Sequence, residues 1–372
     1  MSDYQRLGNY IREVNVRNSE LKVKKLVGLT IDKAFIPSVA NVIGTDLSNY
    51  KVIRREQFAC SLMQVSRDGK MPVAMFEEDE AIMSPAYPMF EVVDKTKLLP
   101  QYLMMWFSRS EFDREASYYA VGGVRGSLEW VDFCNMRLPI PSIARQREIV
   151  EEYETLSRRI RLNEQMIVRL EETAQALYRK MFVEGENDRN AILKDICDVK
   201  SGFAFKSEWW QANGVPVIKI NNIHDNTIYR NECDCVAEDK ARIAYKSIAH
   251  KGDIVIALTG NVGRTSIVPD EGYLVNQRVG LFNVDVIARE FLYLALNSNE
   301  IQNTILSVGG GSVQTNISPT DIESIPIKLP VKESMKGFHE QASLVFNAIF
   351  LKQQENLKLT ELQSLLLARM GK

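Results

Sequence analysis

Cysteine, histidine and long hydrophobic runs are all scarce in this chain of 372 residues. The five cysteines include one close-set pair, Cys233 and Cys235, and an odd total argues against a disulfide framework. No apolar run reaches the roughly 18–20 residues that span a bilayer, and the N-terminus lacks the apolar core of a signal peptide. These features lead us to expect a soluble cytoplasmic protein.

Motifs that would carry catalysis are also missing from the sequence. The nearest approach to a phosphate-binding loop, Gly260-NVGRT, is too short and has arginine where lysine is required. The stretch Ser84-PAYP lacks the amide or acid of an amino-methylation motif. Cys233 and Cys235 have no second pair to complete a tetrahedral zinc site. The sequence therefore favours a protein without catalytic residues, a metal or a cofactor of its own.

Charge gives no direct sign of a partner, because 46 basic and 48 acidic side chains leave a net charge of −2. A protein that binds nucleic acid is expected to carry a basic face. Any affinity for DNA must therefore come from the local placement of charge, or from a partner that supplies more of it.

What the chain does contain is an internal repeat. The segments 120–141 and 309–330 share one register, which places Asp132 on Asp321 and Pro141 on Pro330. The same offset lays Tyr102-LMMWFSRSEF over Phe291-LYLALNSNEI, and both have helical spacing. The strand candidates correspond at slightly different offsets, as Phe58-ACSLM does with Ile254-VIALT, because loops diverge faster than the frame that holds them. The repeat indicates a duplicated chain.

Each half of the chain is predicted to be a mixed α/β (α+β) globule followed by a long helix. The expected boundaries are 1–141 for the first domain, 142–183 for its helix, 184–330 for the second domain and 331–372 for the second helix. Within the second domain, Ser318-PTD combines an N-cap hydroxyl, a proline at the first helical position and an acid at the third, which predicts a short helix.

Both long helices carry a coiled-coil seam, since apolar residues recur at alternating spacings of four and three. We expect the two seams to pair with each other in antiparallel fashion. Packing of each helix on its own globule, or a homodimer, are the alternatives. Asn163 and Lys352 align and would form a polar layer that fixes the register. The first seam consists of Ile149, Tyr153, Leu156, Ile160, Asn163, Ile167, Leu170, Ala174, Leu177 and Met181, and the second of Phe338, Ala342, Val345, Ile349, Lys352, Asn356, Leu359, Gln363, Leu366 and Met370.

Several short motifs of the chain resemble those of one known family. The stretch Leu138-PIPSIARQREIV is similar to the family's proline-rich segment at the end of a domain, followed by the start of a helix. The recurring motifs of a target-recognition domain resemble Ser201-GFAFKS, Pro216-VIKINNI, Gly252-DIVIALTGNVGR and Gly311-SVQTNIS. With the duplicated layout, they make the chain resemble the specificity subunit of type I restriction-modification systems. The first half lacks a clear counterpart of Ser201-GFAFKS.

The resemblance implies a subunit that recognises a bipartite, asymmetric site on double-stranded DNA, one short half for each domain, without catalysis of its own. It implies as partners two DNA methyltransferase subunits and, for cleavage, restriction/translocase subunits. Those partners would hold S-adenosylmethionine, ATP and magnesium, and none of these is expected in this chain. A coiled-coil scaffold whose duplicated domains bind protein is the alternative function.

Residues that suit direct readout of bases are arginine or lysine toward guanine and asparagine or glutamine toward adenine, on loops that a rigid frame holds. Arg145, Gln146 and Arg147 at the first helix start are candidates for methyltransferase binding by resemblance. The candidates for DNA contact are Arg67, Lys70, Arg125 and Ser127 in the first domain, and Lys219, Asn221, Asn222, Thr259, Asn261, Arg264, Gln277, Arg278, Gln314 and Asn316 in the second.

Overall fold

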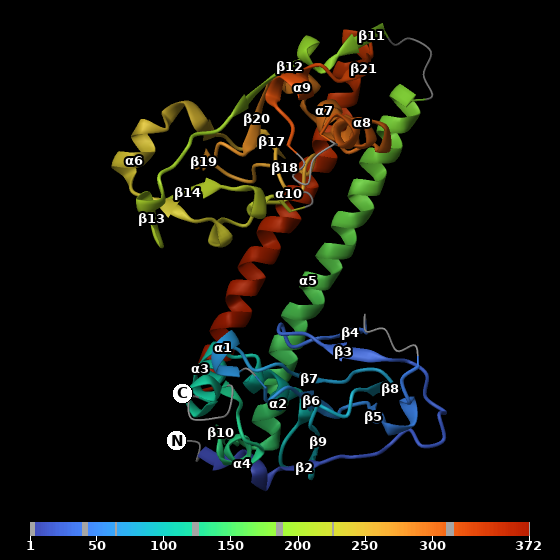
Figure 1. The fold of residues 1–372 in the computed structure, drawn as a ribbon, viewed down its shortest axis with the longest axis vertical. Coiled ribbons are helices and arrows are strands. Elements are labelled where there is room, and N and C mark those ends of the chain that lie inside the picture. Colours follow the sequence, from blue (N-terminus) through green and yellow to red (C-terminus); the bar gives the residue numbers. More distant parts are fainter. Residues whose placement is uncertain are drawn as a thin grey trace. The chain divides into compact units, whose positions relative to one another are not determined.

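The structure, a computed structural model, describes residues 4–38, 44–63, 65–120, 126–183, 189–224, 227–309 and 316–371. Two compact units divide the chain. Unit 1 comprises Met1–Leu162 with Glu355–Lys372, and unit 2 comprises Asn163–Gln354 (Figure 1). Each unit therefore contains one globular domain and a segment of both long helices. Among the described residues, no helix is long and apolar enough to cross a membrane.

The domain of unit 1 is built on a four-stranded antiparallel sheet in the order β2-β9-β6-β7, with two small sheets, β3-β4 and β5-β8, beside it. A further pair, β1 with β10, lies where the chain enters and leaves the domain. The elements are β1 (Tyr4–Arg6), β2 (Ile11–Glu13), β3 (Val27–Leu29), β4 (Phe35–Pro37), β5 (Lys51–Arg54), β6 (Phe58–Cys60), α1 (Val65–Asp68), β7 (Val73–Met75), β8 (Glu80–Met83), β9 (Met89–Val92), α2 (Pro100–Phe107), α3 (Ser110–Tyr119), α4 (Trp130–Asn135) and β10 (Arg137–Pro139).

The domain of unit 2 repeats this plan with the sheet β12-β20-β17-β18 and the entry pair β11-β21, and its second sheet has five strands, β13-β15-β14-β19-β16. In this second sheet β14 and β19 run parallel, as Leu26 and Ile82 do in unit 1 through an isolated bridge that links the β3-β4 and β5-β8 pairs. The elements are β11 (Arg189–Ile192), β12 (Cys197–Ser201), β13 (Trp210–Gln211), β14 (Val215–Ile218), β15 (Cys235–Val236), α6 (Glu238–Ile243), β16 (Ile248–Ala249), β17 (Ile254–Ala257), β18 (Thr265–Ile267), β19 (Tyr273–Val275), β20 (Val279–Val284), α7 (Arg289–Leu296), α8 (Asn299–Gly309), α9 (Pro319–Glu323) and β21 (Pro326–Leu329).

The duplication predicted from the sequence is confirmed by this element order. In the register that places Asp132 on Asp321, the first residues of four elements in unit 1 coincide with those of four elements in unit 2. The coinciding pairs of elements are α2 with α7, α3 with α8, α4 with α9, and β10 with β21. The fold class is therefore the mixed α/β class that the pattern predicts.

The predicted start of α9 is also confirmed. The Ser318 hydroxyl accepts from the Asp321 amide at 3.1 Å, while the Ser318 amide donates to the Asp321 carboxylate at 2.9 Å. Both ends of this reciprocal cap satisfy backbone amides that the first turn of a helix leaves without a partner.

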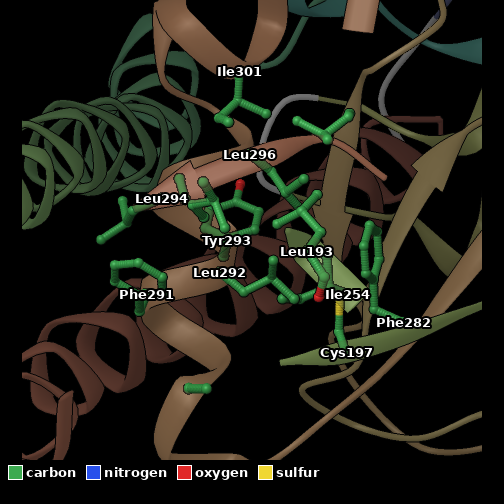
Figure 2. Close-up of a cluster of buried hydrophobic side chains, with 14 of the residues drawn as sticks. Leu193, Cys197, Ile254, Phe282, Phe291, Leu292, Tyr293, Leu294, Leu296 and Ile301 are labelled. Atoms are coloured by element: carbon green, nitrogen blue, oxygen red, sulfur yellow. Dashed lines mark hydrogen bonds between the residues drawn. The ribbon is translucent and has the colours of Figure 1, made fainter. Parts of the chain in front are cut away.

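The core of unit 2 forms where α7 packs against the sheet β12-β20-β17-β18. Leu193, Ile254 and Phe282 contribute from the strand side, and Phe291 and Leu292 from α7, all of them buried (Figure 2). Apolar residues in α7 occupy every position from Phe291 to Leu296, which is why this helix is enclosed on all sides. The sheet and helix thus form one rigid body from which the connecting loops project.

The two long helices, α5 (Ile143–Tyr178) and α10 (Lys332–Arg369), pair in antiparallel fashion within each unit. In unit 1, the early residues Ile149 and Tyr153 of α5 share a core with Leu367 and Met370 at the end of α10. In unit 2, the last turn of α5 meets the start of α10, where the rings of Tyr178 and Phe338 have centroids 6.5 Å apart. The predicted antiparallel seam is confirmed in both units.

Seam positions behave as the heptad pattern predicts. Asn163 has only 2% of its surface exposed although it is polar, as expected for a polar layer in the seam. Phe338, Ala342, Ile349 and Met370 of the second seam are all buried. A short π-helix (Arg179–Val183) continues α5 and brings Phe182 against Phe338, with ring centroids 5.0 Å apart.

Truncating the aromatic seam residue should destabilise unit 2. We expect Phe338→Ala to lower the free energy of unfolding by about 3–5 kcal/mol, because it leaves a cavity beside Tyr178 and Phe182. Leu344→Ala, on the same helix but 70% exposed, is the matched control and should change stability little. Urea unfolding followed by tryptophan fluorescence measures both, and equal losses would contradict the seam.

Candidate nucleic-acid interface

Loops from four separate segments of unit 2 meet beyond the ends of β14 and β17 and the start of β20. The Leu258 amide donates to the Arg278 carbonyl at 3.0 Å, and the Ile317 amide donates to the Leu258 carbonyl at 3.0 Å. The Asn276 amide donates to the Ile218 carbonyl, also at 3.0 Å. We call residues 219–222, 258–264, 276–278 and 316 the loop cluster of unit 2. Backbone hydrogen bonds fix its segments to one another, so its side chains project from a rigid base.

The motif that begins at Ser201 forms the floor of this loop cluster. Gly202 approaches the backbone so closely that a Cβ there would overlap the Val275 carbonyl oxygen, which excludes any other residue. Next to it, the Phe203 amide donates to the Val275 carbonyl at 2.8 Å, and the Phe203 carbonyl accepts from the Gln277 amide at 2.9 Å. The glycine in Ser201-GFAFKS is therefore needed to join β12 to the loop before β20.

Six of the predicted DNA-contact residues lie exposed on the loop cluster. They supply amide groups, which both donate and accept hydrogen bonds, and guanidinium groups, which only donate. This is the set of side chains that reads base edges in a major groove. The six are Asn221, Asn261, Arg264, Gln277, Arg278 and Asn316.

Lys219 and Asn222, by contrast, are engaged within the protein. The Lys219 ammonium pairs with the Asp234 carboxylate and lies 3.5 Å from the centre of the Trp210 ring. Asn222 is 6% exposed; its side-chain oxygen accepts from the Lys219 amide and its nitrogen donates to the Glu232 carbonyl, both at 2.9 Å. Asn222 thus holds the loop rather than facing outward.

Thr259 lies where the loop after β17 meets Asn316 through an antiparallel bridge. Its hydroxyl oxygen is buried and has no hydrogen-bond partner among the residues that the structure describes. A hydroxyl in that position is costly to leave unpaired, and it lies directly beside the exposed Asn316.

In unit 1 two of the four predicted residues form ion pairs within the protein. The Arg67 guanidinium contacts the Asp68 carboxylate at 2.7 Å, and the Lys70 ammonium contacts the Asp32 carboxylate at 3.0 Å. Ser127 is half-buried on the segment before α4. Two further candidates, Arg125 and Gln314, lie outside the described residues.

Of the three candidates for methyltransferase binding at the start of α5, one is buried and two are exposed. Gln146 is fully buried and its side chain bonds the Leu99 amide and the Lys97 and Pro141 carbonyls at 2.8–2.9 Å. Arg145 and Arg147 are exposed, and Arg145 contacts Glu148 at 2.8 Å. Gln146 therefore fixes the helix start, and only the two arginines are accessible to a partner.

One group of residues beside the loop cluster was not predicted from the sequence as a site of DNA contact. The ammonium groups of Lys206 and Lys240 lie 5.8 and 5.7 Å from the centre of the Trp209 ring, and Phe203 stacks on the same ring. The adjacent pair Trp209 and Trp210, close after Lys206, was the signal in the sequence. Cation–π contacts of this kind hold lysines at a surface. The Lys240 ammonium also contacts the Asp239 carboxylate at 2.9 Å.

Comparison with known proteins gives a consistent result. Residues 190–361 match the family model for a type I restriction modification DNA specificity domain. The chain is 25% identical over 247 residues to the type I restriction enzyme MjaVIII specificity subunit of Methanocaldococcus jannaschii, covering 60% of this chain and 58% of that protein. It is 21% identical over 362 residues to the putative MjaX specificity subunit of the same organism, covering 90% and 81%.

The fold has a counterpart among solved structures. The crystal structure of a type I restriction-modification S subunit from M. genitalium aligns over 100% of this chain and 96% of that one, with a TM-score of 0.59 and 13% identity. At that identity the likeness concerns the fold alone.

Two adjacent asparagines have different predicted roles: Asn222 supports the loop, and Asn221 is exposed to a ligand. We expect Asn222→Ala to lower the free energy of unfolding by about 1–3 kcal/mol, because it leaves a buried amide and a buried carbonyl unpaired. The exposed neighbour, substituted as Asn221→Ala, should leave stability within about 0.5 kcal/mol. Chemical unfolding of both variants tests this, and equal stability would show that Asn222 has no supporting role.

Proposed function

We propose that the chain is a member of the type I restriction-modification DNA specificity family that recognises a bipartite, asymmetric DNA sequence and directs methyltransferase subunits to it. The observation that carries the proposal is the loop cluster of unit 2, where exposed amide and guanidinium groups project from a base of backbone hydrogen bonds. The duplicated domain supplies a second reader of the same architecture.

The chemistry of the cluster supports direct readout of bases. Arg264 and Arg278 have the planar guanidinium groups that pair with the O6 and N7 atoms of guanine, and Asn261, Gln277 and Asn316 have the amides that pair with adenine. Lys206, Lys219 and Lys240 lie alongside. They suit phosphate oxygens once Lys219 and Lys240 exchange their carboxylate partners, Asp234 and Asp239, for phosphate. The proposed site therefore combines base-specific groups with groups that only position the duplex.

Catalysis is assigned to partners in this proposal. Two DNA methyltransferase subunits would supply S-adenosylmethionine, and restriction/translocase subunits would supply ATP and magnesium, so this chain acts as a non-catalytic adaptor in the cytoplasm. Arg145 and Arg147 are the exposed residues at the start of α5 that we assign to methyltransferase contact. The scaffold that binds only protein has no support among the relatives, which are named as specificity subunits.

Arg264 provides a test of base readout. If it contacts a guanine, Arg264→Ala should cost about 1–3 kcal/mol in binding and relax the preference at one position of one half-site. Arg189→Ala is the control. Arg189 is in β11, which leads into the start of β12, whereas the loop cluster lies beyond the other end of β12 (Figure 1). Modification-sensitive sequencing of DNA from cells that carry each variant with its methyltransferase partner gives the preference, and a uniform loss across all sequences would instead assign Arg264 to phosphate.

Salt dependence separates a DNA reader from a protein scaffold. The complex should lose affinity for its DNA site linearly in log salt, with a slope of about −0.9 for each phosphate contacted, while it keeps its sequence preference. Binding to a randomised duplex library at rising salt measures both quantities. Absence of any selected sequence at low salt would favour the scaffold.

A further inference from the structure

The strand registers of the two main sheets show which residues of unit 1 correspond to the loop cluster of unit 2. Ala59 lies opposite Met89 in the β6–β9 ladder, and Val255 lies opposite Leu281 in the β17–β20 ladder. Counting back from Met89 and Leu281, Pro85 and Ala86 take the positions that Gln277 and Arg278 take in unit 2. The turn before β9 is therefore the counterpart of the turn before β20.

A second pair of backbone bonds extends the alignment. The Leu128 amide donates to the Leu62 carbonyl at 2.8 Å, as the Ile317 amide donates to the Leu258 carbonyl at 3.0 Å. Leu62 and Leu258 each lie three residues beyond the aligned strand positions. It follows that Met63 corresponds to Thr259, and Ser127 to Asn316.

The chemistry at these four positions differs between the units. Threonine, glutamine, arginine and asparagine in unit 2 are replaced by Met63, Pro85, Ala86 and Ser127 in unit 1. Met63 is 63% exposed, and Pro85 and Ala86 are also exposed. Met63, Pro85 and Ala86 have no strong donor or acceptor, so these three positions cannot make the base hydrogen bonds available to Thr259, Gln277 and Arg278 in unit 2.

The apolar turn in unit 1 is held in place from within. The Ala86 amide donates to the Ser84 hydroxyl at 3.3 Å, and the Lys51 ammonium donates to the Tyr87 carbonyl at 2.8 Å. Lys51 is a strand residue of β5 with only 6% of its surface exposed, and burial lowers its pKa. A buried ammonium fixed on the turn keeps Pro85 and Ala86 presented outward.

We propose that unit 1 reads its half-site by apolar contact between Met63, Pro85 and Ala86 and the 5-methyl groups of thymine, whereas unit 2 reads by hydrogen bonds. This rests on the proposed DNA-reading function. The thymine methyl is the apolar group that base edges present in the major groove, and alanine is among the side chains that pack against it. The two half-sites are thus distinguished by different physical interactions.

Replacing thymine by uracil tests this, because it removes the methyl group and leaves the base-pairing groups unchanged. The recognised sequence is first found by modification-sensitive sequencing with the full chain and its methyltransferase partner; failure to find one would count against the proposed function itself. Met63→Ala and Arg278→Ala then assign each half-site to its unit. Duplexes with uracil in one half-site or the other are finally compared in binding.

Uracil in the half-site of unit 1 should weaken binding about fourfold for each contacted methyl, the equivalent of about 0.8 kcal/mol per buried CH₂ group. Uracil in the half-site of unit 2 should leave binding unchanged. In the Met63→Ala variant the penalty for uracil should shrink, which loss of folding alone would not produce, and Pro85→Ser serves as a second variant. An unchanged affinity for uracil in the first half-site, or a first half-site without thymine, would overturn the inference.

Discussion

One backbone hydrogen bond, present once in each unit, holds together two loops that carry several of the reading side chains. It joins the segment before the last short helix of the domain to the loop that follows β17 in unit 2 and β6 in unit 1. The bonded residues are Ile317 and Leu258 in unit 2, and Leu128 and Leu62 in unit 1. In unit 2 it belongs to the bridge between Thr259 and Asn316, and Ile317 and Leu258 also share the buried core, so the loop after β17 and the segment that carries Asn316 are held side by side. Because the bond uses only main-chain atoms, it places no restriction on the side chains around it.

That freedom explains how a duplicated domain becomes asymmetric. The frame of each unit depends on apolar strands, on α2 or α7, and on paired seams, and these positions match at fixed offsets along the chain. Positions 63, 85, 86 and 127 contribute little to the frame, as do 259, 277, 278 and 316, so they vary from threonine or arginine to methionine or alanine without disturbing the fold. Loops on a rigid scaffold change more readily than the scaffold itself. An asymmetric DNA site requires such divergence, because two identical readers related by the repeat would select two identical half-sites.

The repeat, the helices, the main strands and the seam could be predicted from the sequence, because each is a periodic pattern of residues close together in the chain. The five-stranded sheet of the second domain could not, since β14 pairs in parallel with β19, which is far from it in the sequence. The same limit applies to single residues. Asn222 looks like its neighbour Asn221, and only contact with the Glu232 carbonyl, from a later segment, makes it buried. Gln146, which looked accessible beside two arginines, is fixed by the Lys97 carbonyl and the Leu99 amide, both from the segment just before α2.

The net charge of −2, which taken alone opposes DNA binding, has a different meaning once the ion pairs are known. Lys219 with Asp234, Lys70 with Asp32 and Arg67 with Asp68 are cations beside carboxylates at the surface. Exposed pairs of this kind contribute about 0–1 kcal/mol, so exchanging the carboxylate for a phosphate oxygen costs little. The carboxylates lower the attraction for any duplex, whatever its sequence, and leave the neutral amides of the loop cluster unaffected. A reader with balanced charge therefore depends more on base contacts for its affinity, which favours discrimination between sites over tight binding to DNA in general.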